Sequence, residues 1–213
     1  MKPHQRILLD ELLPSIEILP PRDVTQLDPA KFFSSSVNQI WLEIGFGSGE
    51  HLVTQAINNP SVGFIGCEPY INGVARILTS ISKLGLSNVR IFRDDARILL
   101  KALPDQSIAR TFILFPDPWP KARHHKRRIV GPKTVSALCR LMPKGAELRI
   151  ATDDPSYKEW ILRHILSCAG FEWRARRPQD WQVKLVDWPE TRYEIKANAA
   201  GRQCSFFLFS REA

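Results

Sequence analysis

The sequence lacks any long apolar run. No segment approaches the roughly 20 consecutive apolar residues that a helix needs to span a bilayer. The first residues are basic, but Asp10 and Glu11 interrupt the apolar positions before the core of a secretory signal peptide could form. We therefore expect a cytoplasmic protein with no membrane partner.

Cysteine is scarce, and its spacing excludes two common uses. The four cysteines form no C-x-x-C pair and have no companion histidines at the spacing of a zinc site; they are Cys67, Cys139, Cys168 and Cys204. We interpret them as reduced, mostly buried thiols, as is usual in the cytoplasm. No metal is expected.

Acidic residues are too few to balance the basic ones. The 213 residues include 30 Lys and Arg against 22 Asp and Glu, which gives a formal net charge of +8. Clustered cations gain affinity for polyanions by releasing phosphate counterions, so this excess favours a polyanionic partner. Net charge alone does not separate a nucleic acid from a membrane surface. The length and the 44% hydrophobic content are typical of one globular domain.

A regular alternation of apolar runs and helical patterns begins at Ile40. We expect strands at about residues 40–45, 62–67, 88–92, 110–115 and 146–151, and helices at about 50–58, 70–84, 95–102, 130–142 and 154–169. Such alternation predicts a parallel sheet covered on both faces. Two more strands, near 171–176 and 204–210, are separated by a polar loop and suggest an antiparallel hairpin at one edge.

The predicted fold class is therefore α/β, with a doubly wound, mostly parallel sheet of about seven strands. We expect this domain to occupy residues 39–213. Residues 1–38 are rich in proline and contain one short amphipathic patch, so we interpret them as an N-terminal arm that can be flexible.

The first predicted strand ends in a glycine-rich turn. Gly45, Gly47 and Gly49 alternate there, and glycine lets the backbone bend tightly and approach a ligand. The dinucleotide fingerprint G-x-G-x-x-G would need glycine where this chain has Glu50. A pyrophosphate would also meet the carboxylate of Glu43. The turn therefore favours a cationic cofactor over a phosphate-bearing one, with a plain tight turn as the alternative.

Acidic residues follow the next two predicted strands. Glu68 ends the second strand, 23 positions after Gly45, at about the spacing used to bind ribose hydroxyls. Asp95 follows the third strand and is suited to accept a hydrogen bond from an adenine amino group. Together with the glycine turn, these acids predict a pocket for an adenosine-containing cofactor.

The stretch from Thr111 to Arg128 joins an acid to a basic cluster. Residues 111–115 predict a buried strand, and the three prolines at 116, 118 and 120 prevent further ladder pairing. Asp117 is therefore held at the carboxyl end of a strand, where open α/β sheets bind ligands. The basic residues that follow favour a grip on an RNA backbone. The alternative is a proline-rich turn with a solvated charged face.

Several motifs resemble known families. Leu42-Glu-Ile-Gly-Phe-Gly-Ser-Gly49 resembles the first motif of the Rossmann-like S-adenosylmethionine-dependent methyltransferases. Phe115-Pro-Asp-Pro-Trp-Pro-Lys121 and the basic cluster after it are similar to the tRNA (guanine-N7-)-methyltransferases. Ala151-Thr-Asp153 and Thr191-Arg-Tyr-Glu194 agree with that family. The resemblance covers roughly residues 40–212.

The resemblance implies a fold, a cofactor and site residues. It implies a Rossmann-like methyltransferase fold and S-adenosylmethionine as cofactor, with S-adenosylhomocysteine as product. The expected cofactor residues are Glu43, Gly45, Gly47, Gly49, Glu68, Asp95 and Asp117. The expected guanosine-binding residues are Lys121, Asp153, Thr191, Arg192, Tyr193 and Glu194. The expected RNA-binding residues are Arg123, His124, His125, Lys126, Arg127 and Arg128.

We therefore expect a monomeric enzyme that methylates guanine N7 in tRNA, at the variable-loop position conventionally numbered 46. Asp117 is the expected catalytic residue, because a fixed carboxylate would stabilise the positive charge that the purine gains. Asp153 is a second candidate, and a helix N-cap is its alternative role. Two rival functions are a methyltransferase of this fold for a small molecule or protein, and a non-catalytic RNA-binding module.

Overall fold

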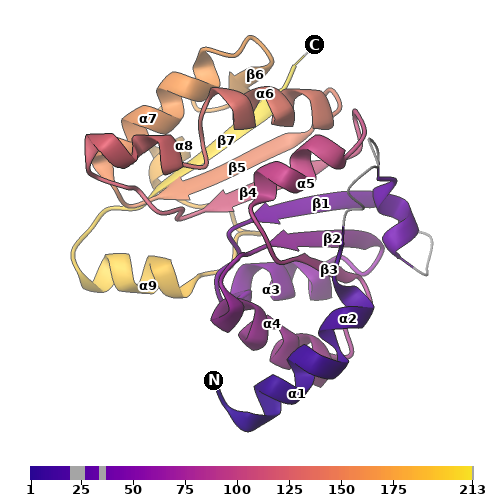
Figure 1. Cartoon of the computed structure of the whole chain (residues 1–213). Helices are drawn as coiled ribbons and strands as arrows, with labels where there is room; N and C mark the ends of the chain where they lie inside the picture. Colours follow the sequence, from indigo (N-terminus) through magenta and orange to yellow (C-terminus); the bar gives the residue numbers. More distant parts are fainter. Residues whose placement is uncertain (20–26, 34–36, 213) are drawn as a thin grey trace.

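The computed structural model describes residues 1–19, 27–33 and 37–212. Within them the chain forms a seven-stranded sheet of order β3-β2-β1-β4-β5-β7-β6 (Figure 1). The strands are β1 (Gln39–Ile44), β2 (Val62–Cys67), β3 (Val89–Phe92), β4 (Arg110–Leu114), β5 (Glu147–Thr152), β6 (Phe171–Trp173) and β7 (Ser205–Arg211). The first five are parallel, whereas β7 is antiparallel to both β5 and β6. The predicted fold class is confirmed, including the antiparallel edge.

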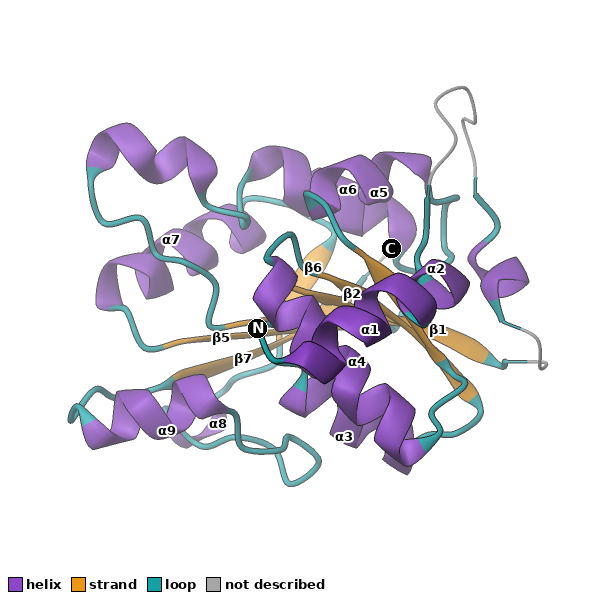
Figure 2. Ribbon diagram, turned by 60° about the horizontal axis from the view of Figure 1, so that its bottom comes forward, coloured by secondary structure: helices purple, strands orange, loops and turns teal. Residues whose placement is uncertain are grey.

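Helices cover both faces of the sheet (Figure 2). One face carries α3 (Glu50–Asn58) and α4 (Ile71–Leu84), and the other carries α5 (Ala96–Ala102), α6 (Pro132–Leu141) and α7 (Pro155–Leu166). Each face has its own buried apolar cluster, since the side chains of α3 and α4 belong to one and those of α5 to α7 to the other. This is the doubly wound arrangement that the alternating pattern predicted, with element ends displaced by at most three residues.

Local sequence explains why these helices form where they do. In α4, Val74, Ile77, Leu78 and Ile81 recur at helical spacing and are buried against the sheet. The helix ends at Gly85, whose φ of +62° is the left-handed conformation that glycine adopts without steric cost.

The described part of the predicted arm packs onto the domain. It contains α1 (Pro3–Glu11), α2 (Leu13–Ile16) and the short 3₁₀ helix η1 (Pro29–Phe32). Leu13 and Ile16 are buried in the cluster of α3 and α4, and the Ile18 N–H donates to the Ile91 carbonyl at 2.7 Å. The arm's residues 20–26 and 34–36 lie outside the described residues, and the boundary between arm and domain stays a prediction.

The segment between β6 and β7 differs from its prediction. We expected a polar loop, but the structure places two helices there, α8 (Gln179–Gln182) and α9 (Arg192–Ala199). The Thr191 hydroxyl starts α9 by accepting a hydrogen bond from the Glu194 N–H at 3.2 Å. The pattern was hidden because α9 buries only Glu194 and Ala197, which leaves no apolar stripe to read from the sequence.

Several chemical expectations can be compared with the described residues. All four cysteines are free; Cys67 and Cys204 are buried, and Cys139 and Cys168 are half-buried. Over the same residues, no helix has the length and apolarity to cross a membrane, and no cluster of three or more His, Cys, Asp or Glu could hold a metal.

The sheet order places the site. Strand β1 lies between β2 and β4, and the chain leaves β1 toward α3 on one face but leaves β4 toward α6 on the other. A crevice opens at such a switch point, beyond the carboxyl ends of the two strands. The glycine turn after β1 and Asp117 after β4 both lie there.

Candidate active site

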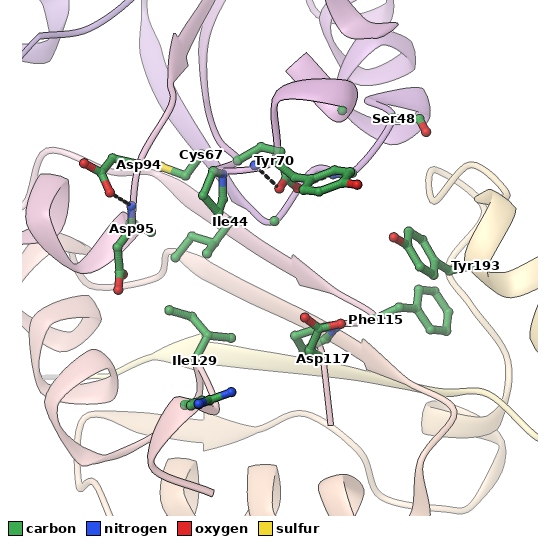
Figure 3. A pocket seen from close by; sticks show the side chains of 18 of the residues that line it. Ile44, Ser48, Cys67, Tyr70, Asp94, Asp95, Phe115, Asp117, Ile129 and Tyr193 are labelled. Atoms are coloured by element: carbon green, nitrogen blue, oxygen red, sulfur yellow. Dashed lines mark hydrogen bonds between the residues drawn. The ribbon is translucent and has the colours of Figure 1, made fainter. Parts of the chain in front are cut away.

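A cavity of about 790 Å³ opens at the carboxyl ends of β1, β2, β3 and β4. The glycine turn forms one wall, the start of α4 and the segment after β3 form others, and the segment after β4 closes the cavity (Figure 3). Tyr193 reaches the cavity from α9, so residues far apart in the sequence line one space. Its size is within the range of small-molecule sites, about 300–1,000 Å³.

The glycine turn depends on left-handed backbone at three positions. Gly45, Gly47 and Gly49 have φ values of +77°, +58° and +84°. Gly45 and Gly47 line the cavity, whereas Gly49 lies behind it, where an added Cβ would come within 2.6 Å of the Ile77 side chain. Gly73, which the sequence analysis missed, lets α4 approach the turn, because its Cβ would lie 2.2 Å from the Gly47 carbonyl oxygen.

Glu68 is held by two backbone donors. The Gly47 N–H donates to one of its carboxylate oxygens and the Tyr70 N–H donates to the other, each at 2.9 Å. Burial raises the pKa of the Glu68 carboxyl above its usual value, and the two amide donors offset only part of this effect. The structure therefore fixes this acid between the turn and α4, on the cavity wall.

The segment after β3 contributes a pair of acids. Asp95 is the N-cap of α5 and accepts from the Arg97 N–H at 2.9 Å, while the Arg97 guanidinium lies 3.2 Å from its other oxygen. Asp94 accepts from the Asp95 N–H at 2.6 Å. Both line the cavity (Figure 3). The sequence analysis named Asp95 and missed Asp94.

Asp117 stands alone among the acids of the cavity. Its carboxylate points into the space between Ile44, Ile129 and Tyr193, and none of the described residues forms a hydrogen bond or an ion pair with it (Figure 3). The backbone around it is unusual, because Phe115 and Trp119 have φ values of +50° and +44° without being glycine. The turn that presents Asp117 is thus tightly specified.

Glu43 lies behind the cavity wall. It is 4% exposed, and its carboxylate lies 2.6 Å from Nδ1 of His51, which is 2% exposed. The pair lies below the glycine turn, beside Thr191 and Tyr193. Direct contact between Glu43 and a cofactor stays a prediction; the observed contact joins the end of β1 to α3 across the glycine turn.

Three of the four residues 191–194 lie beside the glycine turn or the start of α3. Tyr193 lines the cavity, and Cε2 of its ring would meet a Cβ on Gly47 at 3.2 Å. Burial and the nearby charges of Glu68 and Asp117 raise the Tyr193 pKa. Arg192 lies 3.8 Å from Glu50, and the buried Glu194 pairs with Lys184 at 2.9 Å. Their contacts with guanosine stay a prediction.

Asp153 and Lys121 lie outside the main cavity. Asp153 pairs with Arg202 at 2.7 Å and lines a second hollow of about 350 Å³, together with Lys158. The alternative role of Asp153 as a helix N-cap is wrong, because Asp154 caps α7 by accepting from the Tyr157 N–H at 2.7 Å. Lys121 is exposed and starts the 3₁₀ helix η2 (Ala122–Arg127).

Residues 121–128, the basic loop, divide into exposed and buried members. Lys121, Arg123, Lys126 and Arg127 are exposed, and His124 and His125 are half-buried. Arg127 lines the cavity with its guanidinium 4.8 Å from the centre of the Trp119 ring. Arg128 is only 4% exposed. Our prediction that Arg128 binds RNA is inconsistent with this burial, because a phosphate could not reach its guanidinium.

Comparison with known proteins identifies the family of this chain. A family model described as "Putative methyltransferase" matches residues 37–206. The "tRNA (guanine-N(7)-)-methyltransferase" of Rhodospirillum rubrum is 46% identical over 207 residues, which cover 96% of this chain and 81% of the relative.

Solved structures share the fold at low identity. The 16S rRNA methyltransferase KamB superposes with a TM-score of 0.61 at 16% identity, over 84% of this chain and 90% of the other. A Streptococcus mutans "putative methyltransferase" in complex with SAH gives a TM-score of 0.55 at 11% identity, over 83% and 90% of the two chains. The chain belongs to the tRNA (guanine-N(7)-)-methyltransferase family.

Proposed function

We propose that this protein transfers a methyl group from S-adenosylmethionine to N7 of a guanine in tRNA, at the variable-loop position conventionally numbered 46. One observation carries the proposal: the Asp117 carboxylate, unpartnered within the described residues, projects into a cavity between the glycine turn and the basic loop. The name of the Rhodospirillum relative supports the choice of substrate.

The residues of the cavity fit S-adenosylmethionine. Gly45 and Gly47 present backbone without side chains, and Glu68, Asp94 and Asp95 present acceptors for hydroxyl and amino groups. The three arginines of the wall are engaged by neighbouring residues, since Arg76 donates to the Ser48 hydroxyl, Arg97 pairs with Asp95 and Arg127 stacks on Trp119. The SAH bound to the Streptococcus neighbour supports this assignment.

Glu68 and Asp95 would orient the adenosine part. Each oxygen of Glu68 accepts one backbone amide, which fixes the carboxylate and leaves further lone pairs for ribose hydroxyls. Asp95 is fixed as a helix cap and is suited to an adenine amino group. S-adenosylmethionine supplies an electrophilic methyl group bound to a positively charged sulfur.

Asp117 would act by charge and position rather than as a base. Guanine N7 already carries an exposed lone pair, so no proton has to be removed before the new bond forms. A carboxylate beside the base would stabilise the positive charge that the purine gains, and it could accept hydrogen bonds from guanine N1 and N2. Pro116 and Pro118 restrict the backbone on either side of Asp117, so little reorganisation is needed during the reaction.

The exposed cations of the basic loop would hold the tRNA backbone. Lys121, Arg123 and Lys126 project from η2 and its N-terminal end, next to the cavity wall that Arg127 forms. Residues 191–194 and Asp153 would contact the target nucleoside from the other side, where Tyr193 already covers the glycine turn.

The test is methylation of bulk tRNA from cells that lack this modification. The protein is incubated with the tRNA and with S-adenosylmethionine labelled in the methyl group, and the digested nucleosides are separated. Label in 7-methylguanosine is the expected result for the wild-type protein. The control variant Asp105→Asn, which changes an exposed acid, should give the same result. Label in protein or in a small molecule would support a methyltransferase of this fold with that other substrate. Binding of tRNA without label transfer would support a non-catalytic RNA-binding module.

A further inference from the structure

Arg128 is a buried cation without an acidic partner. Its side chain is 4% exposed, and across the described ranges no carboxylate lies within ion-pair distance of it. Burial of an unpaired charge is costly, so the contacts of Arg128 must offset that cost. Those contacts show what the residue holds in place.

The guanidinium joins the turn after Asp117 to helix α7. Its Nε donates to the Pro118 carbonyl at 2.7 Å, and Nη2 donates to the Ser156 hydroxyl at 3.2 Å. The guanidinium carbon lies 5.0 Å from the centre of the Tyr157 ring and 4.8 Å from that of Trp160. Two aromatic rings and two hydrogen bonds thus surround this cation.

Helix α7 also fixes the backbone that follows Arg128. The Val130 N–H donates to the Tyr157 hydroxyl at 3.2 Å, and the Trp160 indole donates to the Val130 carbonyl at 2.6 Å. The residues that surround the guanidinium are therefore the ones that anchor its own main chain. Arg128 can hold the Pro118 carbonyl in place because its own backbone is fixed by α7.

The bond to Pro118 closes the basic loop at its base. It joins residues ten positions apart, and the loop's exposed cations lie between them. Pro118 follows Asp117 directly, and Phe115 and Trp119 on either side have positive φ values that non-glycine residues rarely adopt. Such backbone persists only where the surrounding structure specifies it. The Arg128 guanidinium supplies one such contact and ties this backbone to Ser156 of α7.

We propose that Arg128 is a positioning residue, which sets the Asp117 carboxylate and the basic loop for methyl transfer and makes no contact with RNA phosphate. This inference rests on the proposed function. It separates residues of one basic run into two roles: exposed cations that bind the substrate, and a buried cation that orients the acid beside them.

The experiment compares Arg128→Met with Arg123→Met in the full-length protein. Arg123 is an exposed member of the same loop and serves as the matched control. Formation of 7-methylguanosine is measured in single turnovers at saturating cofactor and tRNA, and tRNA affinity is measured over a range of salt concentrations. Two further measurements report on the fold: calorimetry of cofactor binding, and circular dichroism.

For Arg128→Met we expect a single-turnover rate about 10- to 100-fold lower, on the scale of a misplaced catalytic group. The salt slope of tRNA affinity should stay unchanged, and the amides of residues 122–127 should exchange faster with solvent. Arg123→Met, which changes a proposed phosphate contact, should instead reduce that slope by about 1. Added methylguanidinium should restore part of the rate of Arg128→Ala. Sodium chloride at the same ionic strength should restore less.

A reduced salt slope for Arg128→Met would make Arg128 a phosphate contact, and an unchanged rate would remove its positioning role; either result overturns the inference. If the Arg128 variants do not fold, Trp160→Phe removes the bond to the Val130 carbonyl and keeps the cation. That variant should also lose rate at constant salt slope, and a wild-type rate would count against the proposal. Absence of 7-methylguanosine with wild-type protein would instead refute the proposed function, while amide exchange would still report on the loop.

Discussion

Asp117→Asn should slow methyl transfer by roughly 100-fold while leaving tRNA binding nearly intact. The substitution keeps the size of the side chain and one acceptor oxygen, and it removes the charge. Asp117 has no partner within the described residues, so no other contact compensates for that charge or is broken by its loss. The effect of the substitution can therefore be read as the loss of one electrostatic contact.

The magnitude follows from charge and exposure. Opposite unit charges about 4 Å apart attract by about 4 kcal/mol at an effective dielectric constant of about 20. Loss of one preorganised contact of this kind typically costs about 100- to 1,000-fold in rate. Asp117 is exposed in the open cavity, and water there weakens the interaction until cofactor and base replace it. We therefore expect the lower end of that range.

The assay is formation of 7-methylguanosine in a single turnover at saturating S-adenosylmethionine. Asp105→Asn is the matched control, because Asp105 is an exposed acid that pairs with Arg140 before β4, whereas Asp117 follows β4 at the opposite end of the strand. The control should behave as wild type. A rate within a few-fold of wild type for Asp117→Asn would remove Asp117 from the mechanism and leave Asp153 as the candidate catalytic carboxylate.

Two further predictions concern the cofactor. Gly47→Val should weaken S-adenosylmethionine binding in calorimetry by about 10-fold or more, because a β-branched residue is strained at φ +58° and its Cβ would meet Tyr193 at 3.2 Å. The control Gly131→Ala, which has open space around its Cβ, should have no effect. Equal affinities in the two variants would refute the role of the turn. Burial raises the Glu68 pKa, so this carboxyl takes up a proton at a higher pH than a free glutamate. Cofactor affinity should therefore fall as the pH falls through that raised pKa. Glu68→Gln should bind the cofactor more weakly at neutral pH and should not show this pH-dependent fall. If the fall persists in Glu68→Gln, it belongs to another titrating group.

Local sequence was sufficient to predict the sheet and the acids at its edge. The five parallel strands and their helices follow from apolar periodicity, which depends on near neighbours in the chain. The glycine turn and the proline-flanked Asp117 were found for the same reason, because each sets the backbone within a few residues. The carboxyl ends of neighbouring parallel strands meet at one edge, so the sequence alone predicts where the cavity lies.

The functions of several side chains depended on segments far away in the sequence. Nothing near Arg128 indicates that Tyr157 and Trp160 enclose it, and within the basic run it looks like its exposed neighbours. The contact of Tyr193 with the glycine turn likewise joins opposite ends of the domain.

The sequence by itself determined which residue types stand at each strand end, because backbone conformation there is a local property. The tertiary structure decided which of those side chains are free to act. Asp153 and Asp154 are adjacent acids before one helix, yet Asp154 caps it and Asp153 pairs with Arg202. Burial and pairing depend on how the helices and strands pack, and that packing joins residues that no local pattern connects.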